Sequence, residues 1–374
     1  MLKKNDLTAL IASSQYVINI SQIAERVYDV LRRVDLDRVV IKDANQFESI
    51  AWQACEKEIG LSDSVTFGVV KSIIDSMKSS FRVFTKEELL SNPYFNAVNG
   101  KEINTICEDI SLQWCEPLIG FIVSNPKKED GVIPMFDCVF TNVRKKELVL
   151  SDRQSVWMSV SPNEIITMQE PIKNAFGNVL ILGLGIGYFP YMISQKDNIK
   201  SITIVENNPN VIKIFKEVLQ PILNIPNLRI VENDAVEFLT FVDDGEYDYC
   251  FVDIWRHSGD ILNYYRCKEV GNAFKRTVID YWIEDSFIQI LKGTFYIALA
   301  QAAFDESGNT IDGTNLIDET LDSLFSEDVI EYTRTIMYNY MEVVKPLVKE
   351  AIDAKELVDK CMTVDIFKKV LDML

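Results

Sequence analysis

The sequence predicts an α/β protein built around a mostly parallel β-sheet with helices on both faces. Between residues 179 and 255, short runs that are apolar throughout alternate with stretches whose apolar residues recur at helical spacing. This pattern is typical of parallel strands that are buried on both faces and joined by crossover helices. The segments before and after this core have a different texture, which divides the chain into regions.

Four regions are predicted. Residues 1–115 form a helical N-terminal region, residues 116–165 a small antiparallel β-element, residues 166–310 the core, and residues 311–374 a helical C-terminal extension. With 374 residues, 48% of them hydrophobic, the chain can bury a sizeable core.

The N-terminal region shows helical periodicity from Asp6 to about Ile59. Either Ser62 or Ser64 is placed to cap a further helix that runs through Met77. The first hundred residues are therefore predicted to be mainly helical.

The β-element follows as short β-prone runs between about residues 118 and 160: "LIGFIV", "MFDCVF", "KELVLSD" and "SVWMSV". The stretches between them have turn composition, which favours a small set of antiparallel strands. A capped helix comes next, with Ser161 as N-cap, Pro162 at the first helical position and Glu164 three residues after the cap.

The core strands are predicted at "VLILG", "SITIVE", "LRIVEND" and "YDYCFVDIW", with a further strand from about Thr294 to Leu299. Helices are predicted after Gly187, at "NPNVIKIFKEVL" and at "AVEFLTFV". From Asp318 the chain turns helical. Either the sheet ends early and these helices cover its edge, or strands such as "DVIEYTRTIMY" lie within this segment.

The stretch "NVLILGLGIGYFPYMI", residues 178–193, joins a strand to a helix through Gly183, Gly185 and Gly187. Such a turn brings backbone N–H groups and a helix N-terminus to the carboxyl edge of a parallel sheet, where ligands bind. A dinucleotide site would have G-x-G-x-x-G, but Tyr188 occupies the position of its last glycine. The pattern is instead G-x-G-x-G.

This pattern resembles the first motif of class I S-adenosylmethionine-dependent methyltransferases and of the related spermidine synthases, over roughly Asp152 to Tyr265. The resemblance implies a Rossmann-like methyltransferase core and S-adenosylmethionine as cofactor. The cofactor-binding residues that it implies are Gly183, Leu184, Gly185, Gly187, Tyr188, Glu206, Asn207, Asn233, Asp234, Ala235 and Asp253.

Three carboxylates receive separate roles from this resemblance. Glu206 would bind the ribose hydroxyls, Asp234 would meet the exocyclic amine of adenine, and Asp253 would face the methionine end and the acceptor. Each of the first two also has a structural alternative: Glu206 as partner of a helix N-terminus, and Asp234 as the cap of the helix that begins at Ala235.

The chain departs from both families. Ile181 stands where many methyltransferases carry an acidic residue, so the amino group of the cofactor needs another partner, either Asp253 or a backbone carbonyl. Ile186 replaces the acidic turn residue of spermidine synthases, and "DIWRHSGD" is not their Asp-rich segment. The chain is more similar to bacterial methyltransferase-like proteins that share the spermidine-synthase-like layout, through "WMSVSPNEIITM" and "LGLGIGY".

For catalysis, the sequence offers Asp253 and His257. Methyl transfer depends mainly on alignment of donor and acceptor, and a base is needed only if the acceptor loses its proton early. His257, the sole histidine, follows Asp253 by four residues and is either a general base or a solvated loop residue. Asp260, Tyr264 and Tyr265 are expected in the same neighbourhood, and Trp157 and Trp255 are expected either to wall the pocket or to belong to the core.

Charge and composition indicate which partners and which cellular compartment suit the protein. A formal net charge of -18 without a basic patch disfavours nucleic acid. Seven cysteines without a CxxC pair are typical of a reducing compartment. The start of the chain does not read as a signal peptide, and no uninterrupted apolar run approaches the length of a membrane span. A cytoplasmic location is expected.

The predicted function is an S-adenosylmethionine-dependent methyltransferase for a small, neutral or cationic acceptor, without a metal. One alternative is a polyamine aminopropyltransferase that uses decarboxylated S-adenosylmethionine. The other is a non-catalytic sensor or scaffold that binds the cofactor. The helical ends of the chain are predicted to serve as a lid or as the surface of a homodimer.

Overall fold

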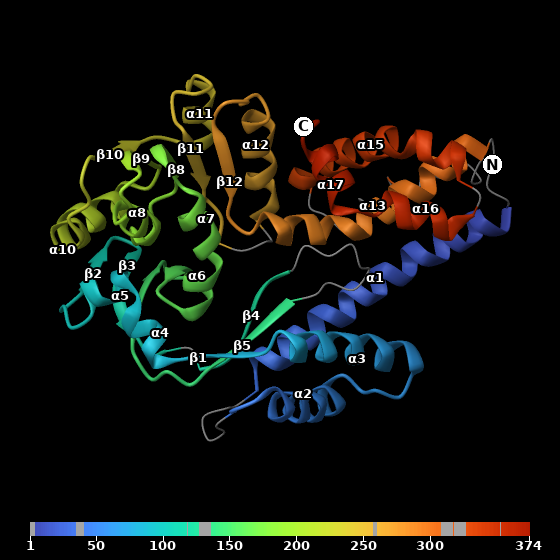
Figure 1. Ribbon diagram of the computed structural model, residues 1–374, viewed down its shortest axis with the longest axis horizontal. Helices are drawn as coiled ribbons and strands as arrows, with labels where there is room; N and C mark the ends of the chain where they lie inside the picture. The colour runs from blue at the N-terminus through green and yellow to red at the C-terminus, as the bar shows by residue number, and fades with distance from the viewer. Residues whose placement is uncertain are drawn as a thin grey trace.

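The structure is a computed structural model that describes residues 4–34, 41–117, 119–126, 136–256, 260–307, 317, 327–351 and 353–374. Figure 1 shows a sheet-containing core, an N-terminal part below it and a group of C-terminal helices beside it. The first helix, α1 (Lys4–Arg32), runs between the N-terminal part and the C-terminal helices.

The core contains a five-stranded sheet in which every neighbouring pair is parallel, in the order β10-β9-β8-β11-β12. The strands are β8 (Gly177–Leu182), β9 (Ile199–Glu206), β10 (Leu228–Glu232), β11 (Tyr249–Val252) and β12 (Val278–Tyr281). Because β8 lies at the centre, the strand order reverses between β8 and β11, where open α/β sheets bind ligands. The predicted fold class is confirmed.

Helical segments connect these strands: α8 (Tyr188–Ser194), α9 (Pro209–Ile214), the π-helical turn η1 (Phe215–Leu219), α10 (Gln220–Leu223), α11 (Ala235–Thr240) and α12 (Ile261–Gly271). The predicted alternation of strands and helices over residues 179–255 is confirmed. It could be read from the sequence because β8, β9 and β11 contain runs of buried apolar residues and the connections between strands are short.

The predicted fifth strand at Thr294–Leu299 is wrong. These residues lie within α13 (Glu284–Ser307), and the fifth strand is the four-residue β12, which pairs in parallel with β11. Both a buried strand and a buried helix give a short apolar run, so periodicity cannot separate them. The segment "DVIEYTRTIMY" is also helical, within α15 (Glu327–Glu350). Within the described residues, the sheet ends at β12 without an antiparallel pair.

The N-terminal region is mainly helical, as predicted, with α2 (Ala44–Glu58), α3 (Ser64–Ser79), α4 (Lys86–Ser91) and α5 (Pro93–Val98) after α1. The cap of α3 is Asp63, not Ser62 or Ser64, because its carboxylate accepts a hydrogen bond from the N–H of Thr66.

Two small sheets precede the core. The order β1-β5-β4 joins β1 (Arg82–Phe84), β4 (Gly120–Pro126) and β5 (Phe136–Thr141); the antiparallel order β2-β3-β6-β7 joins β2 (Asn104–Cys107), β3 (Ile110–Cys115), β6 (Glu147–Ser151) and β7 (Val156–Ser159). The antiparallel strands expected within residues 118–160 are confirmed. Strands β2 and β3 were not predicted, and they lie in the region that was assigned to helices.

The helix predicted after β7 begins as expected. Ser161 caps α6 (Pro162–Thr167) by accepting a hydrogen bond from the N–H of Glu164, and α7 (Gln169–Asn174) follows. The helical character predicted after residue 318 is confirmed for the described part, which contains α15, α16 (Ala354–Cys361) and α17 (Val364–Leu371).

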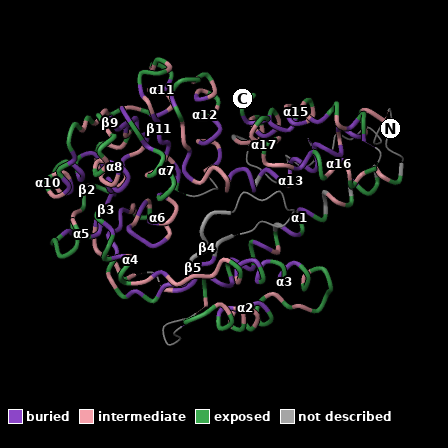
Figure 2. Tube along the Cα trace, viewed as in Figure 1, coloured by how far each residue is buried: buried purple, intermediate pink, exposed green. Residues whose placement is uncertain are grey.

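Buried residues form two clusters among the described residues. The larger cluster joins the parallel sheet, the four-stranded sheet and the C-terminal helices, and the smaller one lies between α1, α2, α3 and the strands β4 and β5. Figure 2 shows the buried stretches along the sheet and along α13. Of the described helices, α13 alone is long and apolar enough to match a membrane span, and 76% of its most apolar window is buried inside the protein.

Phe295 is a test of this helical core. Its ring in α13 is fully buried and stacks on Tyr340 and Phe367 at centroid distances of 4.7 and 4.6 Å. We expect Phe295→Ala to lower the free energy of unfolding by about 3–5 kcal/mol, because it leaves a cavity between three helices. Urea unfolding measures this change. The control is Phe241→Ala, whose side chain is 75% exposed; equal effects of the two substitutions would contradict the placement of α13.

Candidate functional site

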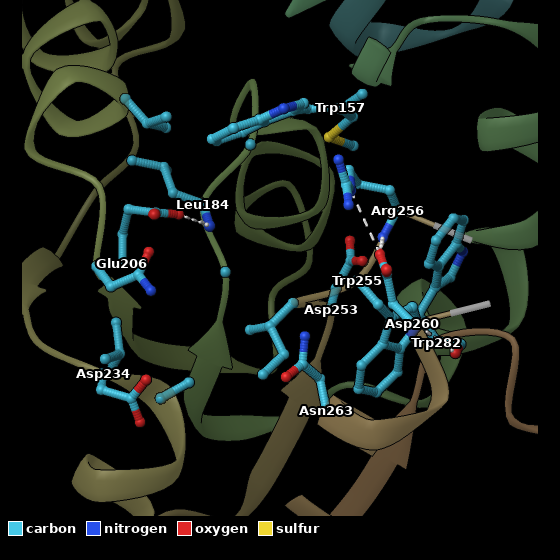
Figure 3. Close-up of a pocket in the computed structure, with 18 of the residues that line it drawn as sticks. Trp157, Leu184, Glu206, Asp234, Asp253, Trp255, Arg256, Asp260, Asn263 and Trp282 are labelled. Carbon is cyan, nitrogen blue, oxygen red and sulfur yellow. Dashed lines mark hydrogen bonds and ion pairs between the residues drawn. The ribbon is translucent and has the colours of Figure 1, made fainter. Parts of the chain in front are cut away.

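A cavity of about 640 Å³ opens at the carboxyl edge of the parallel sheet. Its lining includes eight of the predicted cofactor residues: Gly183, Leu184, Gly185, Glu206, Asn207, Asp234, Ala235 and Asp253. Figure 3 shows Glu206 and Asp234 on one side of this cavity, Arg256 and Asp260 on the other, and Asp253 between them. The ends of β8, β9, β10 and β11 therefore contribute to one site.

The glycine turn is pressed between neighbouring elements. Gly183 has φ 100°, and a Cβ atom there would overlap the backbone carbonyl of Asp253. Gly187 has φ 72°, precedes α8, and has no space for a Cβ atom beside the ring of Phe215. Gly183 and Gly187 thus permit close packing, and Gly183 and Gly185 line the cavity.

Three of the predicted cofactor residues lie outside the cavity lining: Gly187, Tyr188 and Asn233. Tyr188 is buried in α8, where its hydroxyl accepts a hydrogen bond of 2.8 Å from the Nδ2 of Asn92. The Oδ1 of Asn233 accepts from the N–H of Asp234. Tyr188 and Asn233 therefore adjoin residues of the site along the chain without lining the cavity.

The N-terminal region holds the back of the glycine turn. The hydroxyl of Tyr94, in α5, donates a 2.6 Å hydrogen bond to the carbonyl of Ile186. Tyr94 is fully buried, and its ring lies 5.2 Å from that of Tyr188. Sequence reasoning did not find Tyr94, because 92 residues separate it from its partner and no local pattern reports such a contact.

Glu206 fixes the front of the turn. Its carboxylate accepts hydrogen bonds from the N–H of Leu184, at 3.1 Å, and from the N–H of Asn208, at 2.8 Å. Burial raises the pKa of this carboxyl, against the lowering effect of its backbone hydrogen bonds. The cap of α9 is Asn208 rather than Glu206, because the Asn208 side chain accepts from the first helical N–H groups.

Asp234 has the structural role that was weighed as its alternative. Its carboxylate caps α11 by accepting a hydrogen bond of 2.9 Å from the N–H of Glu237. Asp234 also lines the cavity beside Ala235, so capping leaves it at the mouth where the adenine contact is predicted. That contact stays a prediction.

Two further carboxylates, Glu164 and Asp253, line the cavity without a partner of their own. Burial, and secondarily the charge of Asp253, raises the pKa of Glu164 to about 8. Burial, and secondarily the charge of Glu206, raises the pKa of Asp253 to about 7. Neither carboxylate accepts a hydrogen bond or pairs with a cation within the described part of the chain. This is an electrostatic arrangement that favours a bound proton or a bound cation.

Glu164 was recognised in the sequence only as a residue of a helix start. The Ser161 side chain does bond the N–H of Glu164, but the Glu164 carboxylate makes no return bond to the cap. It is therefore available to the cavity. Its meeting with Asp253, 89 positions along the chain, depends on how α6 packs before β8, which no local pattern encodes.

The cation nearest to Asp253 along the chain, Arg256, is already engaged. Its guanidinium donates to the hydroxyl of Ser155 at 3.1 Å and pairs with Asp260 at 3.4 Å. Figure 3 shows Arg256 and Asp260 joined in this way. His257 lies outside the described residues, so its assignment as a base stays a prediction.

The aromatic residues divide into wall and core. Trp157 and Trp255 line the cavity, as predicted, together with Trp282. Tyr264 and Tyr265 do not line it, because both are buried in α12, where the Tyr264 hydroxyl donates to Glu284. Among the described residues, no cluster of three or more histidine, cysteine or acidic side chains is arranged to hold a metal ion.

Comparisons with known proteins give similarity to solved structures only. No protein-family model matches the chain, and no curated protein sequence is similar to it. It is similar to a spermidine synthase from Thermotoga maritima, at 13% identity and a TM-score of 0.33, over 51% of this chain and 63% of that one. It is likewise similar to a spermidine synthase in complex with the transition-state analogue AdoDATO, at 12% identity and a TM-score of 0.33, over 51% and 64%. The match spans less than two thirds of either spermidine synthase.

Tyr94 is predicted to stabilise the glycine turn. Tyr94→Phe removes the hydroxyl and leaves the buried carbonyl of Ile186 without that donor, which costs about 1–3 kcal/mol. We expect the free energy of unfolding, measured in urea, to fall by this amount. Tyr16→Phe is the matched control, because Tyr16 is 46% exposed. A Tyr94→Phe protein as stable as the control would exclude this hydrogen bond as a support of the turn.

Glu164 is predicted to make stability depend on pH. The folded protein holds a proton on Glu164 at pH values where the unfolded chain has lost it, so the free energy of unfolding falls as the pH rises from about 4 to about 8. We expect Glu164→Gln to be more stable than the parent at pH 8, by on the order of 1–2 kcal/mol, and to differ less at pH 5. Urea unfolding at both pH values measures this.

The control for Glu164 is Glu170→Gln in α7, whose side chain is 70% exposed. Its stability relative to the parent should be nearly the same at both pH values. If Glu164→Gln behaves in the same way as this control, Glu164 is ionised in the folded protein at neutral pH.

Proposed function

We propose that the protein is an S-adenosylmethionine-dependent methyltransferase that acts on a small acceptor. The observation that carries this proposal is the cavity at the carboxyl ends of β8, β9, β10 and β11, which brings together the glycine turn, Glu206, Asp234 and Asp253. The sequence alone predicts these residues as one site, and they lie around one cavity of about 640 Å³, a size that suits a small-molecule ligand.

The residues present fit this cofactor. Gly183 and Gly185 leave the backbone accessible at the cavity floor, and Glu206 lies at the end of the next strand, where ribose hydroxyls would meet its carboxylate. Ala235 and Val236 offer an apolar surface beside Asp234, which suits an adenine ring and its amine. The cofactor, when bound, supplies a methyl group on a positively charged sulfur.

The reaction that we propose asks the chain mainly to position its ligands. The indole walls of Trp157, Trp255 and Trp282 reduce the water around the reacting groups, and the cavity holds donor and acceptor together. With the cofactor bound, the cavity would align the acceptor atom with the methyl carbon, opposite the carbon–sulfur bond that would break as the new bond forms. Glu164 or Asp253 receives the acceptor's proton, since both carboxylates lie at the cavity with a raised pKa.

A second function, aminopropyl transfer, has one observation in its favour. The cavity presents the unpaired carboxylates Glu164 and Asp253, while Arg256 is engaged by Asp260. This arrangement repels a ligand carboxylate and attracts amines. Decarboxylated S-adenosylmethionine has no carboxylate, so the same site would suit it.

The proposal extends to location and partners. Seven scattered cysteines support a cytoplasmic location, and the net charge of -18 supports an acceptor other than nucleic acid. We also propose that a homodimer forms through the helical ends of the chain.

The first experiment is a calorimetric titration of the protein with S-adenosylmethionine, S-adenosylhomocysteine and decarboxylated S-adenosylmethionine, with NAD as control. Stronger binding of the first two than of the third is the expected result. Preference for the decarboxylated compound would favour aminopropyl transfer, and failure of all three to bind would overturn the cofactor assignment.

Glu206 provides the test by substitution. We expect Glu206→Gln to weaken binding of S-adenosylhomocysteine by about 10- to 100-fold, because an amide accepts hydrogen bonds from the ribose less strongly than a carboxylate. The control is Glu232→Gln, at the exposed end of β10 outside the cavity lining. Unchanged affinity in Glu206→Gln would remove this residue from ribose binding.

A further inference from the structure

We propose that Glu164 and Asp253 share a proton in the free protein and release it when the sulfonium of S-adenosylmethionine enters the cavity. The pair thereby determines specificity, since it favours the cationic cofactor over the neutral thioether that remains after transfer. This inference rests on the proposed function. It assigns to Glu164 and Asp253 the discrimination between a charged and a neutral ligand in the cavity.

The geometry places both carboxylates at one cavity from opposite elements. Glu164 belongs to the first turn of α6, which precedes the sheet, and Asp253 follows β11 at the centre of the carboxyl edge. Asp253 touches the turn directly, because its backbone carbonyl lies against Gly183. A ligand on the glycine turn therefore lies in the same cavity as both carboxylates.

No described cation neutralises this pair. The other charged groups that line the cavity are Glu206 from β9, Asp234 and Glu237 from α11, Arg256 and Asp260 after β11, and Arg266 from α12. Arg256 is bound to Asp260 and Ser155, and Arg266 lies near Tyr332, whose pKa it lowers. The Tyr188 hydroxyl also feels the charge of Glu164 but is neutral at pH 7, because burial raises its pKa to about 12.

Two carboxylates without a partner repel each other strongly in a partly buried site, and a proton is the simplest relief. Burial and mutual repulsion with neighbouring carboxylates raise the pKa of both groups, which is consistent with a proton held near neutral pH. A sulfonium cation between them supplies the missing charge and lowers both pKa values. The proton then passes to solvent, and no covalent bond changes in this step.

Methyl transfer removes this charge. The product S-adenosylhomocysteine is a neutral thioether, so the carboxylates again repel each other until a proton returns. S-adenosylmethionine and its product differ only by the methyl group and its positive charge, which makes them a matched pair of probes.

The test is calorimetric titration with each compound at pH 7 in phosphate and in Tris, two buffers whose ionisation enthalpies differ. The difference in observed heat gives the number of protons released. We expect release approaching one proton for S-adenosylmethionine and little for S-adenosylhomocysteine. Between pH 5.5 and 7.0, affinity for S-adenosylmethionine should rise by up to about tenfold per pH unit, and affinity for its product should stay flat.

Two variants test whether the released proton comes from Glu164 and Asp253. We expect Glu164→Gln and Asp253→Asn each to reduce the release by at least half and to flatten the pH dependence, while the control Glu232→Gln keeps both. If either variant fails to fold, the comparison of the two ligands in the parent protein still decides the question.

The outcomes separate this inference from the function on which it rests. Binding of both ligands with equal proton release, or with none, would overturn the role of the pair and leave the cofactor assignment intact. Binding of neither ligand would overturn the cofactor assignment and the role of the pair with it.

Discussion

The close approach of the glycine turn to β11 is the constraint on which the site depends. Pairing of β8 with β11 sets Leu182 opposite Val252, so the next residues, Gly183 and Asp253, meet at the edge. Any side chain at Gly183 would overlap the Asp253 carbonyl. The turn is held from the front by Glu206 through the N–H of Leu184 and from behind by Tyr94. One backbone contact therefore determines both the shape of the turn and the position of Asp253.

The C-terminal helices are joined to the core through α12, which packs against α15. Lys268 in α12 pairs with Glu284 at the start of α13 and with Asp372 beyond α17, each at 3.2 Å, and lies 5.0 Å from the centre of the Tyr281 ring. These contacts tie α12 to the end of the chain. Because α12 also carries Asn263 and Arg266 into the cavity wall, the extension helps to position one side of the site.

The sequence predicts those features of the structure that depend on residues close together along the chain. The alternating strands and helices, the turn and the carboxylates at strand ends all follow from patterns within a few residues, since the ends of parallel strands meet at one edge. The helix α13 was misread because it is apolar on nearly every side, being packed against α1, α15 and α17. Tyr94 and Glu164 were missed as site residues because their effect depends on partners about 90 positions away.

Buried carboxylates without a partner, such as Glu164 and Asp253, lower the stability of the folded protein. A protein selected for stability alone would pair Glu164 and Asp253 with a cation or replace them by apolar residues, since unpaired buried charge is unfavourable. Here neither Glu164 nor Asp253 pairs with a described cation, and Arg256, which lines the same cavity, is held by Asp260. The unbalanced negative charge of Glu164 and Asp253 therefore lies at the cavity, where β11 meets the glycine turn. Under the proposed function, a cationic ligand would relieve this repulsion most when it lies beside the turn, so the repulsion that weakens the free protein would also direct the ligand to the position needed for transfer.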